Sequence, residues 1–303
     1  MSADQGSSAR AILYAFLANL GIAVAKTWAA IHTNSGSMLA EAIHSFADSG
    51  NQVLLYLGLR QARRPPDAEH PLGYGKLSYF WSFIVALLLF SVGGLVSIYE
   101  GWRKLKEPEA VSNAWVALTV LGIAVVLETF SLIGALREIR KIARGRTLRD
   151  WLRSTRNAEL VVVMGEDCAA LLGLALAFIF VLCALVTGNP VFDAAGSIVI
   201  GVVLIVVALW MAARIRTLLI GRSAEEDIRK GIERIIAEDP GIEELLNAIT
   251  LQFGPRIMLA AKIRMRPGLS IELAVERINE LERRMKAAFP DIGWCFIEPD
   301  LSD

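Results

Sequence analysis

Four long stretches without a charged side chain constrain this chain more than any other feature. They are 18 to 25 residues long, and a helix that crosses a bilayer needs about 20 apolar residues. Hydrophobic residues make up 54% of the chain and charged residues 20%, whereas a soluble domain is about 45–50% apolar. These features exclude a soluble enzyme, a disordered chain and a secreted domain. The stretches are Leu77–Tyr99, Ala110–Leu127, Cys168–Phe192 and Ala194–Ala213.

Two more membrane helices are predicted before these stretches, although they contain ionisable residues. Residues 1–10 are polar, hold a single Arg and lack a cleavage signal of small residues, so we expect a retained first helix after a short N-terminal cytoplasmic tail. The expected transmembrane domain covers residues 11–221 and is a bundle of six transmembrane helices. They span Ala11–Ile31, Met38–Leu59, Leu77–Tyr99, Val111–Leu136, Ala158–Val186 and Phe192–Ile215.

Basic residues are concentrated in the loops that would lie on one side of the membrane. Residues 1–221 carry a net charge of +4, and the loop after the fourth helix holds eight Arg and Lys residues. By contrast, Thr33–Ser37 and Thr187–Val191 carry no charge. The positive-inside rule therefore predicts that both termini lie in the cytoplasm. We expect an integral, multi-pass protein of a bacterial inner membrane.

Residues 222–303 are acidic, with a net charge of −4, and indicate a cytoplasmic α+β domain. The spacing of apolar residues predicts a helix over Ala224–Glu238, and Ser270 can cap a second helix that runs to Phe289. Gly254-Pro255 indicates a hairpin turn between two strands. The expected α-β-β-α-β order suggests a ferredoxin-like fold, a split βαβ sheet with both helices on one face. The strands are expected at Ala248–Phe253, Ile257–Met265 and Gly293–Ile297.

Eight ionisable residues fall within the predicted membrane helices, where a charge costs about 2.5–3.5 kcal/mol on insertion scales. Six are acidic and one is Lys26, so mutual pairing cannot neutralise them, and a bound cation or protons must do so. His44 and Asp48 lie four residues apart on one helix face, and Asp167 lies at a similar depth. One imidazole with two or three carboxylates suits a divalent first-row metal. The eight residues are Lys26, Glu41, His44, Asp48, Glu128, Glu166, Asp167 and Asp193.

The same residues also have purely structural interpretations. His44 and Asp48 would then be a hydrogen-bonded pair that ties helices together. Adjacent residues of a helix point about 100° apart, so one of Glu166 and Asp167 is expected to face away from a shared site. Asp167 is the favoured ligand, and Glu166 and Glu128 are each open between ligand, proton carrier and helix contact.

The other ionisable residues are expected to have structural roles. Asp193 follows Gly188-Asn189-Pro190 and is predicted to satisfy free N–H groups at a helix start. Lys26 is expected to pair with an acid or to snorkel, and Glu41, nearer the outer interface, to be hydrated. The cysteines are expected to be reduced thiols; they are Cys168, Cys183 and Cys295.

In these segments the sequence resembles the cation diffusion facilitator family of zinc-type metal transporters. The similar segments are SGSMLAEAIHSFADSGNQ, PDAEHPLGYGK, TGNPVFDAAGSIVIG, LLIGRS and the C-terminal tail. The resemblance implies a homodimer whose subunits each bind a divalent cation, zinc first, between the second and fifth helices. It implies export in exchange for protons by alternating access, a secondary transporter rather than an enzyme, and no resident cofactor. Residues 222–303 would then be a dimerisation domain, and no feature suggests nucleic acid.

The resemblance also implies a ligand set. The second-helix pattern, His or Asp followed four residues later by Asp, falls on His44 and Asp48, and the fifth-helix pattern His-x-x-x-Asp falls on Val163 and Asp167. Val163 cannot bind a metal, so the implied four-ligand site is incomplete. An oxygen ligand in its place would favour harder ions such as Mn(II) or Fe(II). The Glu-Asp pair in GEDCAALLG resembles a branch that includes mitochondrial zinc transporters. The candidates to complete the site are Glu166 and Glu128.

A secondary site in the loop between the second and third helices is a further implication. Asp67 and His70 match ligands that some members carry, but Tyr74 stands where those members have another His. The alternative is a rigid turn around Pro65-Pro66. The tail contains no His, so metal sensing there is not expected by that route and dimerisation is its expected role.

Three functional hypotheses follow from the sequence. The first is proton-coupled metal efflux, in which protons and metal compete for His44, Asp48 and Asp167. The second, motivated by Val163, is a non-transporting partner or regulatory subunit of a related transporter. The third is a membrane enzyme, which is disfavoured because the chain has no nucleophile motif, Gly-rich phosphate loop or H-E-x-x-H.

Overall fold

The computed structural model describes residues 19–108, 113–143 and 145–302. The expected N-terminal tail, residues 1–10, and the expected start of the first helix lie outside these residues. The chain divides into two compact units. The first, called the helical unit below, contains Trp81–Gly145, Glu159–Ile215 and the residues up to Gly58; the second, the loop-and-tail unit, contains Leu59–Phe80, Arg146–Ala158 and Arg216–Asp303.

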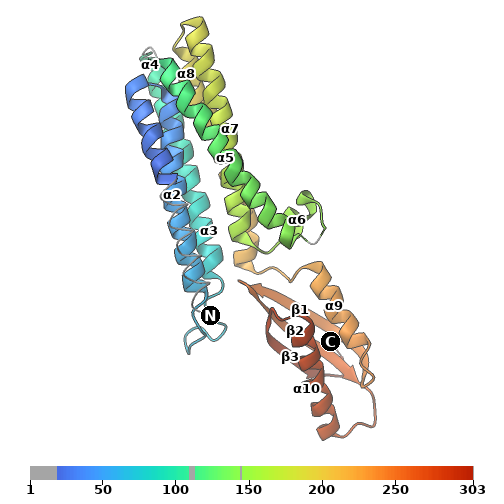
Figure 1. Ribbon diagram of the computed structural model, residues 1–303. Helices are drawn as coiled ribbons and strands as arrows, with labels where there is room; N and C mark the ends of the chain where they lie inside the picture. Colours follow the sequence, from blue (N-terminus) through green and yellow to red (C-terminus); the bar gives the residue numbers. More distant parts are fainter. Residues whose placement is uncertain (1–18, 109–112, 144, 303) are drawn as a thin grey trace, which may run out of the picture. The chain divides into compact units, whose positions relative to one another are not determined.

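Long helices that run side by side form the helical unit (Figure 1). Residues 19–33 are helical, and the chain turns at Asn34, whose φ of 52° is left-handed, before the next helix begins. A π-helical segment, η1, joins α3 to α4 without a break. The helices are α2 (Gly36–Ala62), α3 (Leu77–Leu88), η1 (Leu89–Leu95), α4 (Val96–Lys106), α5 (Ala114–Ile142), α7 (Ala158–Thr187) and α8 (Val191–Ile220).

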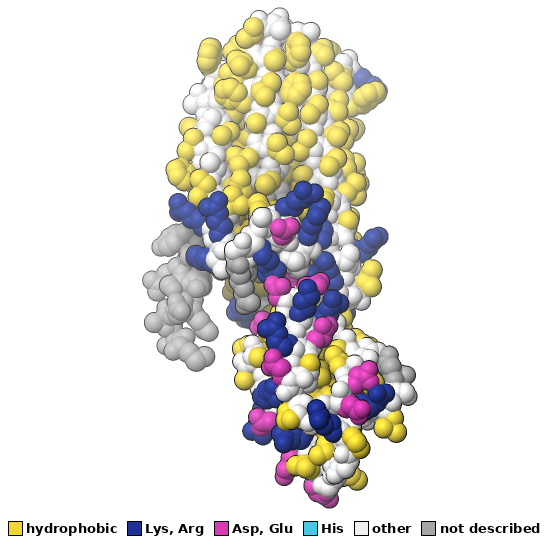
Figure 2. Space-filling model, turned by 90° about the vertical axis from the view of Figure 1, so that its right-hand side faces the viewer, with side chains coloured by type: hydrophobic (Ala, Val, Ile, Leu, Met, Phe, Trp, Pro, Cys, Tyr) yellow, Lys and Arg dark blue, Asp and Glu magenta, His cyan; other side chains and the backbone are white. Residues whose placement is uncertain are grey.

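Within the described residues, four helical stretches are long and apolar enough to cross a membrane. They contain the four predicted uncharged stretches almost entirely, so the chain is a multi-pass membrane protein. Figure 2 shows hydrophobic side chains spread over the outside of the helices, and Trp115 and Phe130 of α5 are 72% and 68% exposed. Such a continuous apolar surface suits contact with lipid. The four stretches are Leu77–Lys106, Ala114–Lys141, Ala158–Thr187 and Val191–Ile220.

Glycines allow the third predicted span to pack closely against α8. A Cβ on Gly201 of α8 would lie 2.7 Å from the carbonyl oxygen of Gly94, and a Cβ on Gly101 would lie 2.7 Å from that of Ala194. Small residues at such contacts let helix backbones approach in membranes. Gly94 belongs to η1, so the π-helical turn coincides with this close contact.

The tail folds in the predicted α-β-β-α-β order. Its elements are α9 (Glu226–Ala237), β1 (Ile242–Phe253), β2 (Arg256–Met265), α10 (Ile271–Ala288) and β3 (Ile292–Pro299). The Ser270 hydroxyl caps α10 by accepting a hydrogen bond from the Leu273 N–H, as expected. β1 begins six residues earlier than predicted, because Glu244 extends the strand by pairing with Arg264 of β2, 2.5 Å away.

The prediction of a split βαβ unit is wrong. The sheet order is β1-β2-β3, with β1 antiparallel to β2 and β3 parallel to β2, so no strand separates the two parallel strands. The chain leaves β2, passes through α10 and enters β3, which pairs directly with β2. The helices do share one face, because α9 contacts β1, α10 contacts β3 and the two helices contact each other. The core between them includes Ile232, Ile236, Leu259, Ile263, Leu281, Met285 and Cys295.

A short helix in the basic loop, α6 (Leu148–Ser154), was not predicted. The Thr147 hydroxyl caps it, and Trp151 is 1% exposed, so the loop has a small core of its own. Arg146 pairs with Glu225 at 2.8 Å, and Arg156 donates a hydrogen bond to the Ser223 carbonyl at 2.7 Å. These contacts attach the basic loop to the start of the tail. All three cysteines are free thiols, as expected.

Candidate metal site

A cavity of about 70 Å³ inside the helical unit brings together four of the predicted membrane carboxylates. They come from three helices: Asp48 from α2, Glu128 from α5, and Glu166 and Asp167 from α7. Residues from the helix over 19–33 close a further side. The complete lining is Asn19, Ile22, Ser45, Asp48, Gln52, Glu128, Ser131, Val163, Glu166, Asp167 and Ala170.

Both adjacent acids of α7 line this cavity, so the expectation that one would face away is wrong. Glu166 is 6% exposed and accepts a hydrogen bond from the Asn51 amide nitrogen at 2.6 Å. Asp167 is half-buried and lies 3.4 Å from the Ser131 hydroxyl through each carboxylate oxygen. The cavity is wide enough to be lined by two neighbouring side chains that point in different directions. The residue that contacts Glu166 comes from α2, and the residue that contacts Asp167 comes from α5.

His44 and Asp48 share one face of α2, as the spacing predicted. Their Nδ1 and Oδ1 atoms are 3.5 Å apart. His44 is fully buried, and neither ring nitrogen has a hydrogen-bond partner among the described residues; the same holds for Asp48 Oδ1. Buried polar atoms without partners are costly and call for a bound species. The structural interpretation, a hydrogen-bonded pair joining two helices, finds no such bond in the described chain. His44 is not part of the cavity lining.

Lys26 pairs with an acid, which is one of its two expected outcomes. The Lys26 ammonium lies 3.2 Å from Glu41 Oε2 and 2.7 Å from the Ser45 hydroxyl, and Lys26 and Glu41 are both fully buried. The expectation that Glu41 is hydrated is therefore wrong. Glu41 lies near the start of α2, but neighbouring helices cover it and the lysine supplies its counter-charge.

Asp193 satisfies free N–H groups, but at the start of a different helix from the expected one. It sits in the first turn of α8 and accepts hydrogen bonds from the backbone N–H of Gly36, at 2.5 Å, and of Ser37, at 3.2 Å, which begin α2. The Ser35 hydroxyl also donates to it at 2.5 Å. Asp193 thus joins α8 to α2 and is only 2% exposed, so it has a structural role, as expected.

The carboxylates line one cavity without converging on one point. Within residues 19–108, 113–143 and 145–302, no three His, Cys, Asp or Glu side chains lie close enough to hold a metal ion together. Val163 lines the cavity beside Asp167 but offers no donor atom. The arrangement can hold protons or a partly hydrated cation, and tighter coordination needs side-chain movement.

Neutral polar residues around the acids were missed by the sequence reasoning. Asn51 and Gln52 follow Asp48 by three and four residues, and Ser131 follows Glu128 by three. Each spacing places an amide or hydroxyl on the same helix face as an acid. A search for polar side chains at these spacings in the membrane helices would have found them.

The loop residues Asp67 and His70 do lie together, in the loop-and-tail unit. Asp67 accepts hydrogen bonds from the Tyr74 hydroxyl at 2.6 Å and from the His70 backbone N–H at 2.7 Å. The hydrogen bond from Tyr74 holds the pKa of the Asp67 carboxyl below its usual value and raises the pKa of the Tyr74 phenol. The His70 and Tyr74 rings stack with centroids 4.3 Å apart. These contacts support the rigid turn, and the secondary metal site stays a prediction.

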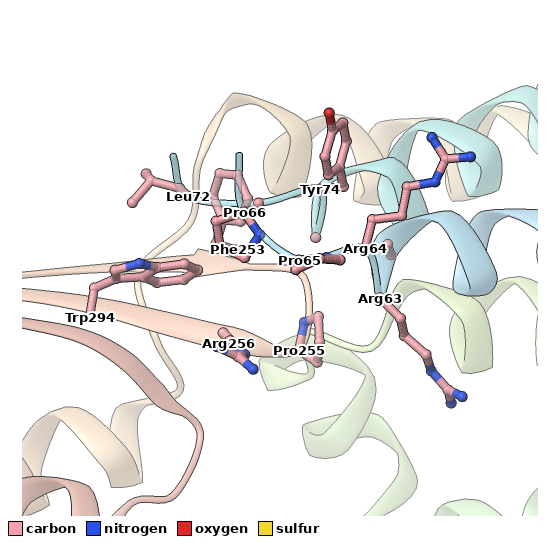
Figure 3. Close-up of a pocket in the computed structure, with 13 residues that line it drawn as sticks. Arg63, Arg64, Pro65, Pro66, Leu72, Tyr74, Phe253, Pro255, Arg256 and Trp294 are labelled. Carbon is pink, nitrogen blue, oxygen red and sulfur yellow. The ribbon is translucent and has the colours of Figure 1, made fainter. Parts of the chain in front are cut away.

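A second cavity, of about 310 Å³, lies in the loop-and-tail unit between the 62–75 loop and the sheet (Figure 3). It has no carboxylate, imidazole or thiol in its lining. Arg63 and Arg64 point away from each other and from Trp294 in Figure 3, so the guanidinium groups do not converge. The donor chemistry that suits a metal is therefore found in the helical unit.

Comparison with known proteins agrees with this location. Residues 12–220 match the family described as "Cation efflux transmembrane domain". The chain is 36% identical to "Metal tolerance protein C4" of Arabidopsis thaliana over 74% of its own length and 49% of that protein. It is 31% identical to "Proton-coupled zinc antiporter SLC30A9, mitochondrial" of Xenopus laevis, over 86% of this chain and 46% of that protein.

A bacterial relative is matched over most of its length. The chain is 26% identical to "Cation-efflux pump FieF" of Shewanella oneidensis, over 88% of this chain and 85% of that protein. It spans only about half the length of the plant and animal relatives.

Proposed function

This chain belongs to the cation efflux, or cation diffusion facilitator, family, and from that premise we propose that it is a secondary transporter of divalent metal cations. Zinc is the first expected cargo, and protons are the expected counter-ion. The observation that carries the proposal is the cavity into which three helices place four carboxylates. Within the described residues, no ammonium or guanidinium lines that cavity, so we expect a bound cation or protons to balance its charge.

The proposed ligands are His44, Asp48 and Asp167, with Glu166 or Glu128 in the place that Val163 leaves vacant. Among the described residues, neither ring nitrogen of His44 has a hydrogen-bond partner, and Asp48 Oδ1 lies 3.5 Å from His44 Nδ1, which supports the first two. Among the described residues, Asp167 is held by 3.4 Å contacts to Ser131, so it can move toward a cation at little cost. We also propose that the chain belongs to the branch of the family that has adjacent Glu and Asp residues on the fifth span. This finer assignment rests on Glu166 and Asp167.

Proton coupling follows from the chemistry of these groups. A metal binds neutral imidazole and ionised carboxylates, so metal and protons compete for the same atoms. Metal entering from the cytoplasm would displace protons, and protons from the other side would expel the metal as the helices rock between two arrangements. A site richer in carboxylate than in imidazole makes Mn(II) and Fe(II) the alternative cargoes.

We also propose the wider architecture of the protein. It comprises six membrane spans over residues 11–221, cytoplasmic termini, a bacterial inner membrane and a homodimer joined by the tail, residues 222–303. Long helices over 19–33 and α2, beside the four apolar spans, support the count. The α-β-β-α-β order supports a ferredoxin-like relationship for the tail, although its parallel strands are direct neighbours. Asp67 and His70 stay a proposed secondary loop site.

A second candidate function is that of a non-transporting partner of a related transporter. Val163 favours it, because a residue without a donor atom lies in the cavity where the family pattern has a ligand. This candidate would keep the fold and the dimer but would bind metal weakly.

Flux measurements separate the two candidates. Purified full-length protein would be placed in liposomes that contain a metal indicator, and uptake of Zn(II), Mn(II), Fe(II) and Cd(II) would be compared with and without an imposed pH gradient. We expect saturable, gradient-dependent flux that falls to the level of empty liposomes in Asp48→Asn and Asp167→Asn. The control is Glu243→Gln, an exposed acid of β1, which should transport normally. Folded wild-type protein without flux of any metal would favour the partner subunit.

A further inference from the structure

The buried ammonium of Lys26 has no part in the proposed ligand set. Lys26 lies on the helix over residues 19–33 with no exposed surface, and it is among the largest fully buried side chains of the described chain. Its ammonium contacts Glu41 Oε2 at 3.2 Å and the Ser45 hydroxyl at 2.7 Å, both on α2. An ammonium is expensive to bury unless it is paired. A lysine kept inside a membrane helix at that cost needs a function.

The ammonium contacts a residue that lines the carboxylate cavity. Ser45 accepts its hydrogen bond and also lines the cavity, one turn before Asp48 on α2. Glu41 lies one turn further away, on the other side of the ammonium along the helix. Along α2 the residues follow the order Glu41, Ser45, Asp48, and the ammonium contacts the cavity-lining Ser45, whereas Glu41 is not part of the lining. In a low-dielectric interior, the ammonium charge of Lys26 acts on the cavity carboxylates with little screening.

The surroundings of Glu41 show that the pair is built into the bundle. The second oxygen, Glu41 Oε1, has no hydrogen-bond partner in the described residues. It is pressed against Gly173 of α7, where a Cβ would collide with it. The helix over 19–33, α2 and α7 therefore meet at this pair, and α2 and α7 also carry the proposed ligands. Lys26 holds the Glu41 carboxylate in position inside the bundle. The two residues therefore form a fixed ion pair, unlike a mobile ion pair on a protein surface.

We propose that Lys26 is a fixed counter-cation of the transport site, held by Glu41, that weakens cation binding in the cavity so that the metal can be released. Lys26 is a positioning residue: it contacts neither the cavity nor the metal, and it acts through the field at Asp48 and its neighbours. Without this charge, four carboxylates would hold a divalent cation more tightly. The inference rests on the proposed transport function and adds a residue that sets its affinity.

The two partners of the pair should change metal affinity in opposite directions. Lys26→Met removes a positive charge, so we expect zinc to bind more tightly, on the order of tenfold at an effective dielectric constant of about 20. Glu41→Gln leaves the lysine charge uncompensated, so we expect zinc to bind more weakly by a similar factor. The double variant, Lys26→Met with Glu41→Gln, should lie between the two single variants. Lys26→Arg keeps the charge and should stay close to wild type.

The measurement is zinc titration of the purified full-length protein in lipid nanodiscs, in competition with a fluorescent zinc chelator. Flux in liposomes gives the second readout: in Lys26→Met the half-saturating zinc concentration and the maximal rate should both fall. Matched controls are Lys230→Met and Glu226→Gln, which break an exposed ion pair of α9 at 3.1 Å. Neither should alter zinc affinity. Gel filtration and thermal unfolding identify variants that do not fold.

Each outcome decides the proposal. A purely structural pair would give weaker binding in both single variants and the same loss in the double variant, and that pattern overturns it. Unchanged affinity in folded Lys26→Met also overturns it. If Lys26→Met does not fold, the comparison of Glu41→Gln with the double variant decides. The proposal requires that the double variant bind zinc more tightly than Glu41→Gln does. Wild-type protein that neither binds nor transports zinc or any other divalent metal would instead refute the proposed function.

Discussion

Val163 is a residue at which this chain departs from the ligand pattern that the family resemblance implies. It lines the carboxylate cavity four residues before Asp167, where the pattern has His. An apolar side chain there leaves the proposed metal with oxygen atoms and one imidazole. Zinc favours nitrogen more than Mn(II) does, so the side chain at this position should set the choice between the two metals.

We expect Val163→His to increase zinc affinity by roughly tenfold, about 1.4 kcal/mol, and to raise the ratio of zinc to manganese flux. The measurement is competitive uptake of the two metals into liposomes. Ala170→His is the matched control, because Ala170 lines the same cavity but does not stand at the family position. Equal effects of both histidines would show that any added imidazole suffices and that position 163 has no special role.

The sequence predicted part of this site and missed the rest for identifiable reasons. Asp48 and Asp167 were placed together by depth and by family pattern, and the cavity contains both. The pairing of Lys26 with Glu41 was open, because a helix pattern gives the face of a residue but not its neighbour on another helix. The same limit concealed Asn51 beside Glu166.

Among the elements, η1 and α8 make a close contact at two glycines. Gly94 and Gly201 bring the two backbones together where the third predicted span is π-helical. A π-helical turn is frequent at functional sites in helices. Rocking of helices requires that some contacts slide, and a contact made by glycines has no side chains that lock it.

Gly201→Ala should therefore destabilise the bundle, since its Cβ would lie 2.7 Å from the Gly94 carbonyl oxygen. The expected loss is about 1–3 kcal/mol, seen as a lower midpoint of thermal unfolding in detergent. Gly122→Ala on α5 is the control, because nothing lies within 4 Å of a Cβ at that position. If both variants unfold at the wild-type temperature, the close contact does not contribute to stability.

Element boundaries in the tail show what local patterns can and cannot give. The caps and turns at Ser270 and Gly254 were visible in the sequence and are present in the fold. The early start of β1 was not, because Glu243 and Glu244 look like a solvated loop until Arg264 on β2 supplies a partner. The adjacency of β2 and β3 depends on where α10 returns the chain, and no local signal encodes that.

At the level of the whole molecule, the loop-and-tail unit constrains the topology. It joins the 59–80 loop, the 146–158 loop and the tail. The Tyr79 hydroxyl donates to the Gly254 carbonyl at 3.0 Å, and Arg146 pairs with Glu225. Segments in contact must lie on one side of the membrane, so an even number of spans separates each from the next. The four apolar spans satisfy this condition, two between the loops and two before the tail.

The positive-inside rule then predicts that this shared side is the cytoplasm, because both loops are rich in Arg and Lys. The short segment between α7 and α8 should lie on the opposite side.

After replacement of the native cysteines, we expect Glu69→Cys and Leu301→Cys to react with a membrane-impermeant thiol reagent only in opened cells. Val191→Cys, 41% exposed at the start of α8, should react in intact cells. Labelling of Leu301→Cys and Val191→Cys from the same side would contradict the span count. Labelling of Glu69→Cys in intact cells would reverse the orientation, and the direction of metal export would reverse with it.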